Sequence, residues 1–300
     1  MKEKTLIIVL GPTASGKTGA SIEIAKHFDA PILSCDSRQF YREIPIGTAA
    51  PTLEEQDGVP HYFVGDRRVT DFYNCGRYEE DAINLLDELF QQHNEVVMVG
   101  GSGLYIDAVC NGMDDIPAVD QAIRPVLAER LETKGLDDLL DELKTLDPDY
   151  YEKVDRQNPA RVIRALEVCL GTGKTYTEQR EGKVKERPFR IIKIGVDYPR
   201  EELYDRINRR VDRMIEQGLE EEARKVYPLR EHNALQTVGF RELFDWFDGK
   251  TTREEAIELI KRNSRRYAKR QMTWFGRDDK TAWFTKGDID KVVQYIKEHE

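Results

Sequence analysis

Residues 11–18, GPTASGKT, form the stretch whose residue types and spacing point most directly to chemistry. They satisfy G-x-x-x-x-G-K-[ST], and they lie between an apolar run and a segment with helical periodicity. In that context the N–H groups of the loop and of the helix start converge on one point, where Lys17 adds positive charge and Thr18 can bind Mg²⁺. The motif predicts a phosphate site formed by Gly11, Pro12, Thr13, Ala14, Ser15, Gly16, Lys17 and Thr18.

A second Gly-Lys-Thr lies at residues 173–175, and its context differs from that of the first. The first glycine of the motif would fall at position 168, which is Val168. The preceding residues have helical periodicity, and we expect Gly171 to end that helix. A helix C-terminus presents carbonyl groups and a negative dipole end, which repel phosphate. We therefore expect no phosphate site there.

Short apolar runs and helical segments alternate through much of the chain. We expect strands at 5–11, 30–37, 95–103 and 189–198, with helices at 17–28 and 77–93. This alternation predicts an α/β fold, a P-loop NTPase-like parallel sheet flanked by helices. Sites in such sheets lie at the carboxyl ends of the strands, here at Gly11–Thr18, Asp36–Arg38 and Gly100–Gly103.

The strand pattern disappears between residues 114 and 187, where several polar helices are expected. We interpret 114–187 as a helical insertion domain within the sheet domain. The P-loop α/β core is then made of residues 1–113 and 188–300, with a helical portion from about residue 200.

Composition is typical of a globular cytoplasmic protein. Hydrophobic residues make up 39% of the 300 positions, which is enough for a buried core. The four cysteines form no C-x-x-C pair, which argues against a structural zinc site or a disulfide framework. The first apolar run, at 5–11, is too short for a membrane span or a signal peptide.

Positive charge is concentrated in one segment although the net charge is −10. Residues 261–277 carry seven basic side chains and no acidic one, whereas a merely solvated helix face usually mixes both signs. At helical spacing, Arg262, Arg266, Lys269 and Thr273 share one face, and Ile260, Tyr267, Gln271, Trp274 and Phe275 share another. The pattern predicts a helix that tracks nucleic-acid phosphates, with Trp274 and Phe275 in the core rather than stacked on bases.

The class of P-loop chemistry depends on where the carboxylates lie. Motor NTPases need an apolar strand that ends in Asp, but the strand at 95–103 ends in glycines. The nearest carboxylate is Asp36, after the second strand. This arrangement favours a small kinase or a group transferase. Position alone leaves Asp36 open as either a catalytic base or a turn residue.

Seven sequence blocks occur in a specific order: GPTASGKT, DSRQFYREIPIGTAAP, GGSGLYIDAV, NPARVIRALEV, LYDRINRRVDRMIEQGLEEEA, QTVGFREL and RYAKRQMTWF. Together, over residues 5–284, they resemble the tRNA dimethylallyltransferases, also called tRNA isopentenyltransferases. The resemblance implies transfer of a dimethylallyl group from dimethylallyl diphosphate to the exocyclic N6 amine of the adenosine just 3′ of a tRNA anticodon. Pyrophosphate is released.

The resemblance also implies roles for individual residues. Asp36 resembles the base that takes the amine proton, while Thr13 and Arg210 contact the leaving pyrophosphate and Mg²⁺ lies on Thr18. Ser102 stands where the family more often has Thr. The tRNA contacts implied are Asp36, Ser37, Arg38, Gln39, Ser102, Arg124, Ala160, Arg161, Val162, Ile163, Arg164, Thr237, Gly239, Arg241, Lys269, Arg270, Gln271 and Trp274.

The chain departs from the family pattern at residues 71–82, DFYNCGRYEEDA, where Asn74 and Cys75 are unusual. The zinc finger of eukaryotic members is absent, which suggests a bacterial-type enzyme, and we expect a monomer.

Three other classes of protein remain to be weighed. An adenylate prenyltransferase acts on free nucleotide and needs no helical insertion, a small-molecule kinase has no use for the basic helix, and an RNA-binding module has none for the phosphate loop.

The contrast between the two Gly-Lys-Thr copies yields a first prediction. Lys17→Ala removes a charge from the phosphate site and should weaken diphosphate binding, whereas Lys174→Ala should leave catalysis nearly unchanged. Steady-state kinetics with dimethylallyl diphosphate and tRNA measure both variants. A large loss of activity in Lys174→Ala would contradict the assignment.

Overall fold

The computed structural model describes residues 3–120, 122–180, 182–285 and 288–299. The chain divides into two compact units, which we call the core unit and the helical unit. The core unit comprises residues 1–110 and 186–300, and the helical unit comprises residues 111–185. None of the helices within the described ranges is long and apolar enough to cross a membrane.

A six-stranded sheet forms the centre of the core unit. The strand order is β3-β2-β4-β1-β5-β6, and every neighbouring pair is parallel, so the α/β prediction is confirmed. Two short strands were not expected, because two and five residues are too few to carry a clear pattern. The strands are β1 Thr5–Leu10, β2 Ile32–Ser34, β3 His61–Tyr62, β4 Glu95–Gly100, β5 Arg190–Asp197 and β6 Thr281–Thr285.

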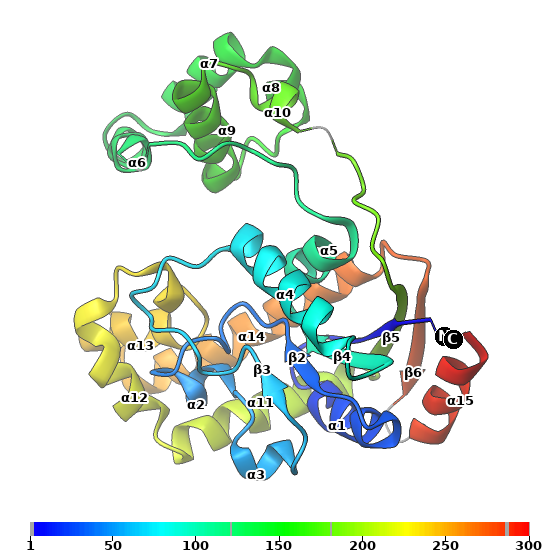
Figure 1. The fold of residues 1–300 in the computed structure, drawn as a ribbon. Helices are drawn as coiled ribbons and strands as arrows, with labels where there is room; N and C mark the ends of the chain where they lie inside the picture. The colour runs from blue at the N-terminus through cyan, green and yellow to red at the C-terminus, as the bar shows by residue number, and fades with distance from the viewer. Residues whose placement is uncertain (1–2, 121, 181, 286–287, 300) are drawn as a thin grey trace. The chain divides into compact units, whose positions relative to one another are not determined.

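Helices cover both faces of this sheet (Figure 1). Along β1, Ile7 and Val9 face one side with residues of α1 and α15, while Leu6 and Ile8 face the other with residues of α4, α5 and α14. A strand buried on both faces reads as a continuous apolar run, as TLIIVL does. The covering helices are α1 Lys17–Phe28, α4 Cys75–Leu89, α5 Gly103–Asn111, α14 Arg253–Phe275 and α15 Ile289–His299.

A second apolar cluster in the core unit joins α2, α11, α12 and α13 to α14. Phe240 and Leu243 of α13 pack there against Ile260 of α14, all fully or nearly fully buried. The helices are α2 Pro45–Thr48, α3 Leu53–Gln56, α11 Arg200–Glu216, α12 Leu219–Val226 and α13 Phe240–Phe247, with 3₁₀ turns at Tyr227–Leu229 and Asn233–Leu235.

The helical unit has an apolar core of its own, which includes Leu127, Leu139 and Leu166. Its longest helix begins as the sequence suggests, with the Asn158 side chain accepting from the Arg161 amide and proline at the first position. The helices are α6 Ile123–Lys134, α7 Leu136–Leu146, α8 Pro148–Lys153, α9 Pro159–Thr172 and α10 Tyr176–Gln179.

Helix α9 ends later than predicted. Gly171 lies inside the helix, and Gly173 ends it with a left-handed φ of 70°. A Cβ at Gly171 would lie 2.7 Å from the side chain of Val119, so the glycine there permits close packing. The prediction of a stop at Gly171 was wrong by two residues, because a packing glycine and a capping glycine look alike in sequence.

Close packing also explains the glycine that ends β4. A Cβ on Gly100 would lie 2.6 Å from the backbone oxygen of Cys35, next to Asp36. Gly100→Ala should therefore push β2 and β4 apart and lower the free energy of unfolding by about 1–3 kcal/mol. Urea unfolding measures the loss. Gly19→Ala in α1 is the control, because a Cβ there meets nothing within 4 Å and should be neutral or stabilising. Equal stability of the two variants would contradict this account.

Candidate functional site

The backbone of the loop between β1 and α1 packs closely against the backbone of β5. A Cβ on Gly11 would lie 2.6 Å from the Val196 carbonyl oxygen, so a side chain cannot fit there. Gly16 caps α1 in the left-handed region, with a φ of 82°. The Lys17 ammonium donates to the Pro12 carbonyl at 3.3 Å and so folds back over the loop. The loop has the strand-turn-helix context that a phosphate site requires.

A cavity of about 680 Å³ opens beside this loop, at the carboxyl edge of the sheet. It brings together residues that are far apart in sequence, from the phosphate loop, the segment after β2, and helices α11 and α14. The sequence-predicted site residues that line it are Thr13, Lys17, Thr18, Asp36, Ser37, Arg38, Gln39, Arg210, Thr237, Gly239, Arg241, Arg270 and Gln271.

Positive charge is crowded in the cavity. Burial and, to a smaller extent, the nearby Arg210 guanidinium together lower the pKa of Lys17 to about 8, while Asp36 opposes the shift. Burial also lowers the pKa of Arg210, with Asp36 again opposing. The Arg210 side chain donates to the Thr48 carbonyl at 3.5 Å. Two desolvated cations and one carboxylate make a strong site for a polyanion.

Asp36 takes part in a turn and also lines the cavity. One carboxylate oxygen accepts from the Arg38 amide at 3.0 Å, and the Asp36 amide donates to the Ser34 hydroxyl at 3.4 Å. The turn reading of this residue is therefore correct. It does not exclude catalysis, because the same turn orients the carboxylate beside Lys17 and Arg210.

The neighbours of Asp36 are held by side chains of the core unit. The Ser102 hydroxyl accepts from the Ser37 amide at 3.0 Å and donates to the Ser37 hydroxyl at 3.2 Å. The Gln39 side chain accepts from Ser34 at 2.9 Å and donates to the Ala49 carbonyl at 3.0 Å. Ser102 and Gln39 thus fix the shape of the segment, and Ser102 itself does not line the cavity.

Helix α14 supplies a second wall. The buried Gln271 side chain accepts from the Thr13 backbone N–H and donates to the Gly101 carbonyl, both at 2.9 Å. Gln271 thereby ties the phosphate loop to the turn after β4. Arg262, Arg266, Lys269 and Thr273 are all exposed, and Arg262 and Arg266 also line the cavity.

Trp274 is held within the core unit. Its indole nitrogen donates to Asp107 at 3.0 Å, and its ring lies where a Cβ on Gly103 would be, at 2.2 Å. The expectation that this side chain packs in the core is confirmed, and as a tRNA contact it would need to leave that packing.

The residues implied in the helical unit differ in exposure. Val162 and Ile163 are buried in its apolar core as part of the α9 apolar stripe, so a tRNA contact there would involve their backbone rather than their side chains. Ala160 and Arg161 are exposed. The buried Glu167 carboxylate accepts two hydrogen bonds from Arg124, at 2.6 and 2.9 Å, and lies 3.6 Å from Arg164.

The second Gly-Lys-Thr follows the C-terminus of α9, as the sequence predicts. Lys174 is exposed, and the Thr175 side chain caps α10 by accepting from the Glu178 amide. A four-residue helix with its own cap occupies the place where a phosphate-binding helix would start.

Sequence reasoning assigned no role to two residues that support the cavity. The Glu222 carboxylate accepts from the Ile46 and Gly47 amides at 2.9 and 2.7 Å, which holds the segment that ends at Thr48. Arg206 donates to the carbonyl of Ala14 at 2.8 Å. Each lies in a charged helical run whose pattern does not distinguish a bonded side chain from a solvated one.

The donor set limits how a metal could bind. Within the described ranges no group of three His, Cys, Asp or Glu side chains comes together. The Thr18 hydroxyl and the Asp36 carboxylate both line the cavity. Mg²⁺ commonly binds through one or two side-chain oxygens plus substrate phosphates, and these residues fit that pattern.

Comparisons with known proteins agree with this geometry. A family model described as IPP transferase matches residues 39–278. The chain is 53% identical to a tRNA dimethylallyltransferase of Bacteroides fragilis over 99% of both chains, and 55% identical to one of Phocaeicola vulgatus over 97% of both. Among solved structures, a tRNA isopentenylpyrophosphate transferase of Bacillus halodurans matches with a TM-score of 0.71 and 39% identity, over 99% of this chain and 95% of that one.

A eukaryotic dimethylallyltransferase acting on tRNA matches with a TM-score of 0.80 and 26% identity, over 99% of this chain and 77% of that one. The chain therefore belongs to the IPP transferase family of tRNA dimethylallyltransferases.

Proposed function

We propose that this protein transfers a dimethylallyl group from dimethylallyl diphosphate to the N6 amine of the adenosine 3′-adjacent to a tRNA anticodon. The observation that carries the proposal is one cavity that holds the phosphate loop, Asp36 and Arg210 together. Family membership favours tRNA over free adenylate and over a kinase acceptor. We further propose that the protein works as a cytoplasmic monomer.

In the proposed reaction the amine nitrogen attacks the first carbon of the dimethylallyl group. The C–N bond forms as the C–O bond to the diphosphate breaks, and pyrophosphate carries away the bonding electrons. Lys17, Arg210, Thr13 and the loop amides stabilise the charge that develops on the leaving group. A Mg²⁺ ion held by Thr18 and the substrate phosphates would add to that stabilisation.

Asp36 accepts the proton that the amine loses. A carboxylate suffices, because the nitrogen becomes acidic only as the new C–N bond makes it cationic. The Arg38 amide donates to one carboxylate oxygen of Asp36 at 3.0 Å. This uncharged donor orients the carboxylate. For reaction, the adenine must leave the stack of the anticodon loop and enter the cavity, as in other base-modifying enzymes.

Asp36→Asn tests the assignment of the base. The amide keeps an oxygen that can accept from the Arg38 amide, so the turn should persist while the proton acceptor is lost. We expect kcat to fall by roughly 10²–10⁴-fold with tRNA affinity retained. The assay incubates enzyme, Mg²⁺, dimethylallyl diphosphate and unmodified tRNA, then digests the RNA and quantifies dimethylallyladenosine. Product with free AMP alone, or loss of tRNA binding in the variant, would overturn the reading.

Lys17 gives a prediction about pH. The free site loses the Lys17 proton as pH rises through about 8, whereas a bound diphosphate stabilises the charged ammonium and raises its pKa. Above pH 8, binding of dimethylallyl diphosphate should take up a proton, and affinity should fall by up to about tenfold per pH unit. Calorimetry in buffers of different ionisation enthalpy measures the proton count. Lys17→Arg stays charged and should lose this dependence, and the ligand's own ionisation is common to both proteins.

A further inference from the structure

The loop after β3 lies at the catalytic edge of the sheet. Because β3 is parallel to β2, the chain leaves it at the edge where Asp36 follows β2. The loop is bonded to the segment after Asp36, since the Gly65 amide donates to the Gln39 carbonyl and the Arg67 amide to the Phe40 carbonyl, both at 2.9 Å. Its position is therefore tied to the segment that lines the cavity.

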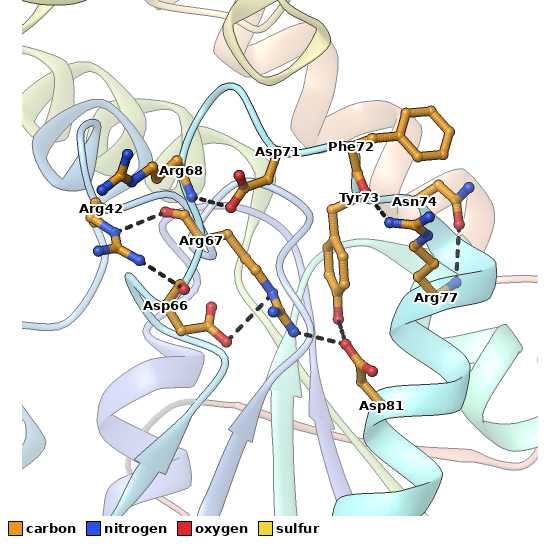
Figure 2. A network of polar contacts seen from close by, with 10 residues as sticks. All are labelled: Arg42, Asp66, Arg67, Arg68, Asp71, Phe72, Tyr73, Asn74, Arg77 and Asp81. Atoms are coloured by element: carbon orange, nitrogen blue, oxygen red, sulfur yellow. Dashed lines mark hydrogen bonds and ion pairs between the residues drawn. The ribbon is translucent and has the colours of Figure 1, made fainter. Parts of the chain in front are cut away.

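A network of hydrogen bonds and ion pairs, which we call the frame, holds the end of this loop (Figure 2). Tyr73 is buried, and its hydroxyl donates to Asp81 at 2.9 Å. Arg67 donates to the same carboxylate at 2.7 Å and lies 4.6 Å from the centre of the Tyr73 ring. The Asn74 side chain then caps α4 by accepting from the Arg77 amide at 3.0 Å. Asn74 is one of the residues that depart from the family pattern.

Phe72 is held by this frame but projects away from the Arg67–Asp81 pair (Figure 2). Its side chain is large and apolar, and the residue is 62% exposed. The Arg77 guanidinium lies 5.2 Å from the ring centre and donates to the Phe72 carbonyl at 2.9 Å. An exposed aromatic ring beside an oriented guanidinium is a combination that proteins use to stack on unpaired bases.

The exposed charges along this loop and its neighbouring segment favour a polyanion (Figure 2). Within the described part of the chain, the side chains of Arg42, Arg68 and Arg77 are exposed and make no ion pair with a carboxylate. Two of them are oriented by backbone carbonyls, with Arg42 donating to Asp66 and Arg77 to Phe72. Three nearby carboxylates are engaged, Asp66 and Asp81 by Arg67 and Asp71 by the Arg68 amide.

We infer that Phe72 and Arg77 form a stacking platform for an unpaired nucleobase of the tRNA anticodon arm, with Arg68 and Arg42 contacting its phosphates. The inference rests on the proposed function and extends the RNA-contacting surface to residues 68–77. It also gives a purpose to the departure at 71–82, where a capping Asn74 and a buried Tyr73 fix the direction in which Phe72 points.

Phe72→Ala tests the platform. Loss of one base–aromatic stack should raise the KM for tRNA, and the Kd for an anticodon stem–loop RNA, by about tenfold. The kcat and the KM for dimethylallyl diphosphate should not change. Phe72→Tyr keeps the ring and should behave as wild type. Leu53→Ala is the matched control, because Leu53 is 86% exposed and lies outside the cavity lining.

Two further measurements separate stacking from charge. An abasic site introduced at each anticodon-loop position in turn should, at one position, make wild type and Phe72→Ala bind equally. Arg68→Gln should reduce the slope of log K against log salt by about 0.7, while Phe72→Ala leaves that slope unchanged. An unchanged Kd and KM in Phe72→Ala, with urea unfolding as in wild type, would overturn the inference, and the ring would then be assigned to a protein partner or to none.

The failure of the proposed function is distinguishable from the failure of this inference. A wild-type protein that makes no dimethylallyladenosine refutes the function, and the stem–loop Kd still tests Phe72. A wild-type protein that makes the product as well as Phe72→Ala does refutes only the platform.

Discussion

The burial of two cations, Lys17 and Arg210, at one cavity is the constraint on which the candidate site depends. Both cations have lowered pKa values because the cavity shields them from water, and the Arg210 guanidinium lowers the pKa of Lys17 further. The Asp36 carboxylate offsets part of the cost of burial at both cations, and Glu55 offsets part of it at Arg210. An anion with several negative charges would offset more of it, which favours a polyanionic ligand at this site. The sheet positions Lys17 and Asp36 by its parallel register, and α11 adds Arg210 from outside it.

Gln271 joins this electrostatic centre to the basic helix α14. It is a buried residue of that helix, which also carries exposed arginines, and its side chain bonds to the phosphate loop. Its amide satisfies the Thr13 N–H and the Gly101 carbonyl together, so the phosphate loop, the turn after β4 and the basic helix hold fixed relative positions. A buried side-chain amide with both ends bonded resists displacement, because moving it would leave two backbone groups unpaired.

Sequence predicted the fold and the centre of the site because those depend on local patterns. Strand β1 and helix α1 follow from an apolar run and a glycine motif, and Asp36 follows from its place after a strand. The residues expected to contact tRNA were harder to predict, because a polar residue that bonds to the protein and one that faces solvent look alike in sequence. Gln39 and Glu222 hold backbone groups, which depends on partners up to 176 residues away in the chain. Val162 and Ile163 came with a family block, and only the packing of α9 shows that they face inward.

The two Gly-Lys-Thr copies show why context decides the chemistry of a motif. At Lys17 the tripeptide starts a twelve-residue helix after a strand, so free N–H groups and a positive dipole end face the cavity. At Lys174 the tripeptide follows a fourteen-residue helix, so the carbonyl groups at the end of that helix point toward it. The threonine hydroxyl there accepts from the Glu178 amide, as a capping residue does. The same tripeptide is therefore placed to bind an anion after β1, whereas after α9 it ends one helix and starts the next.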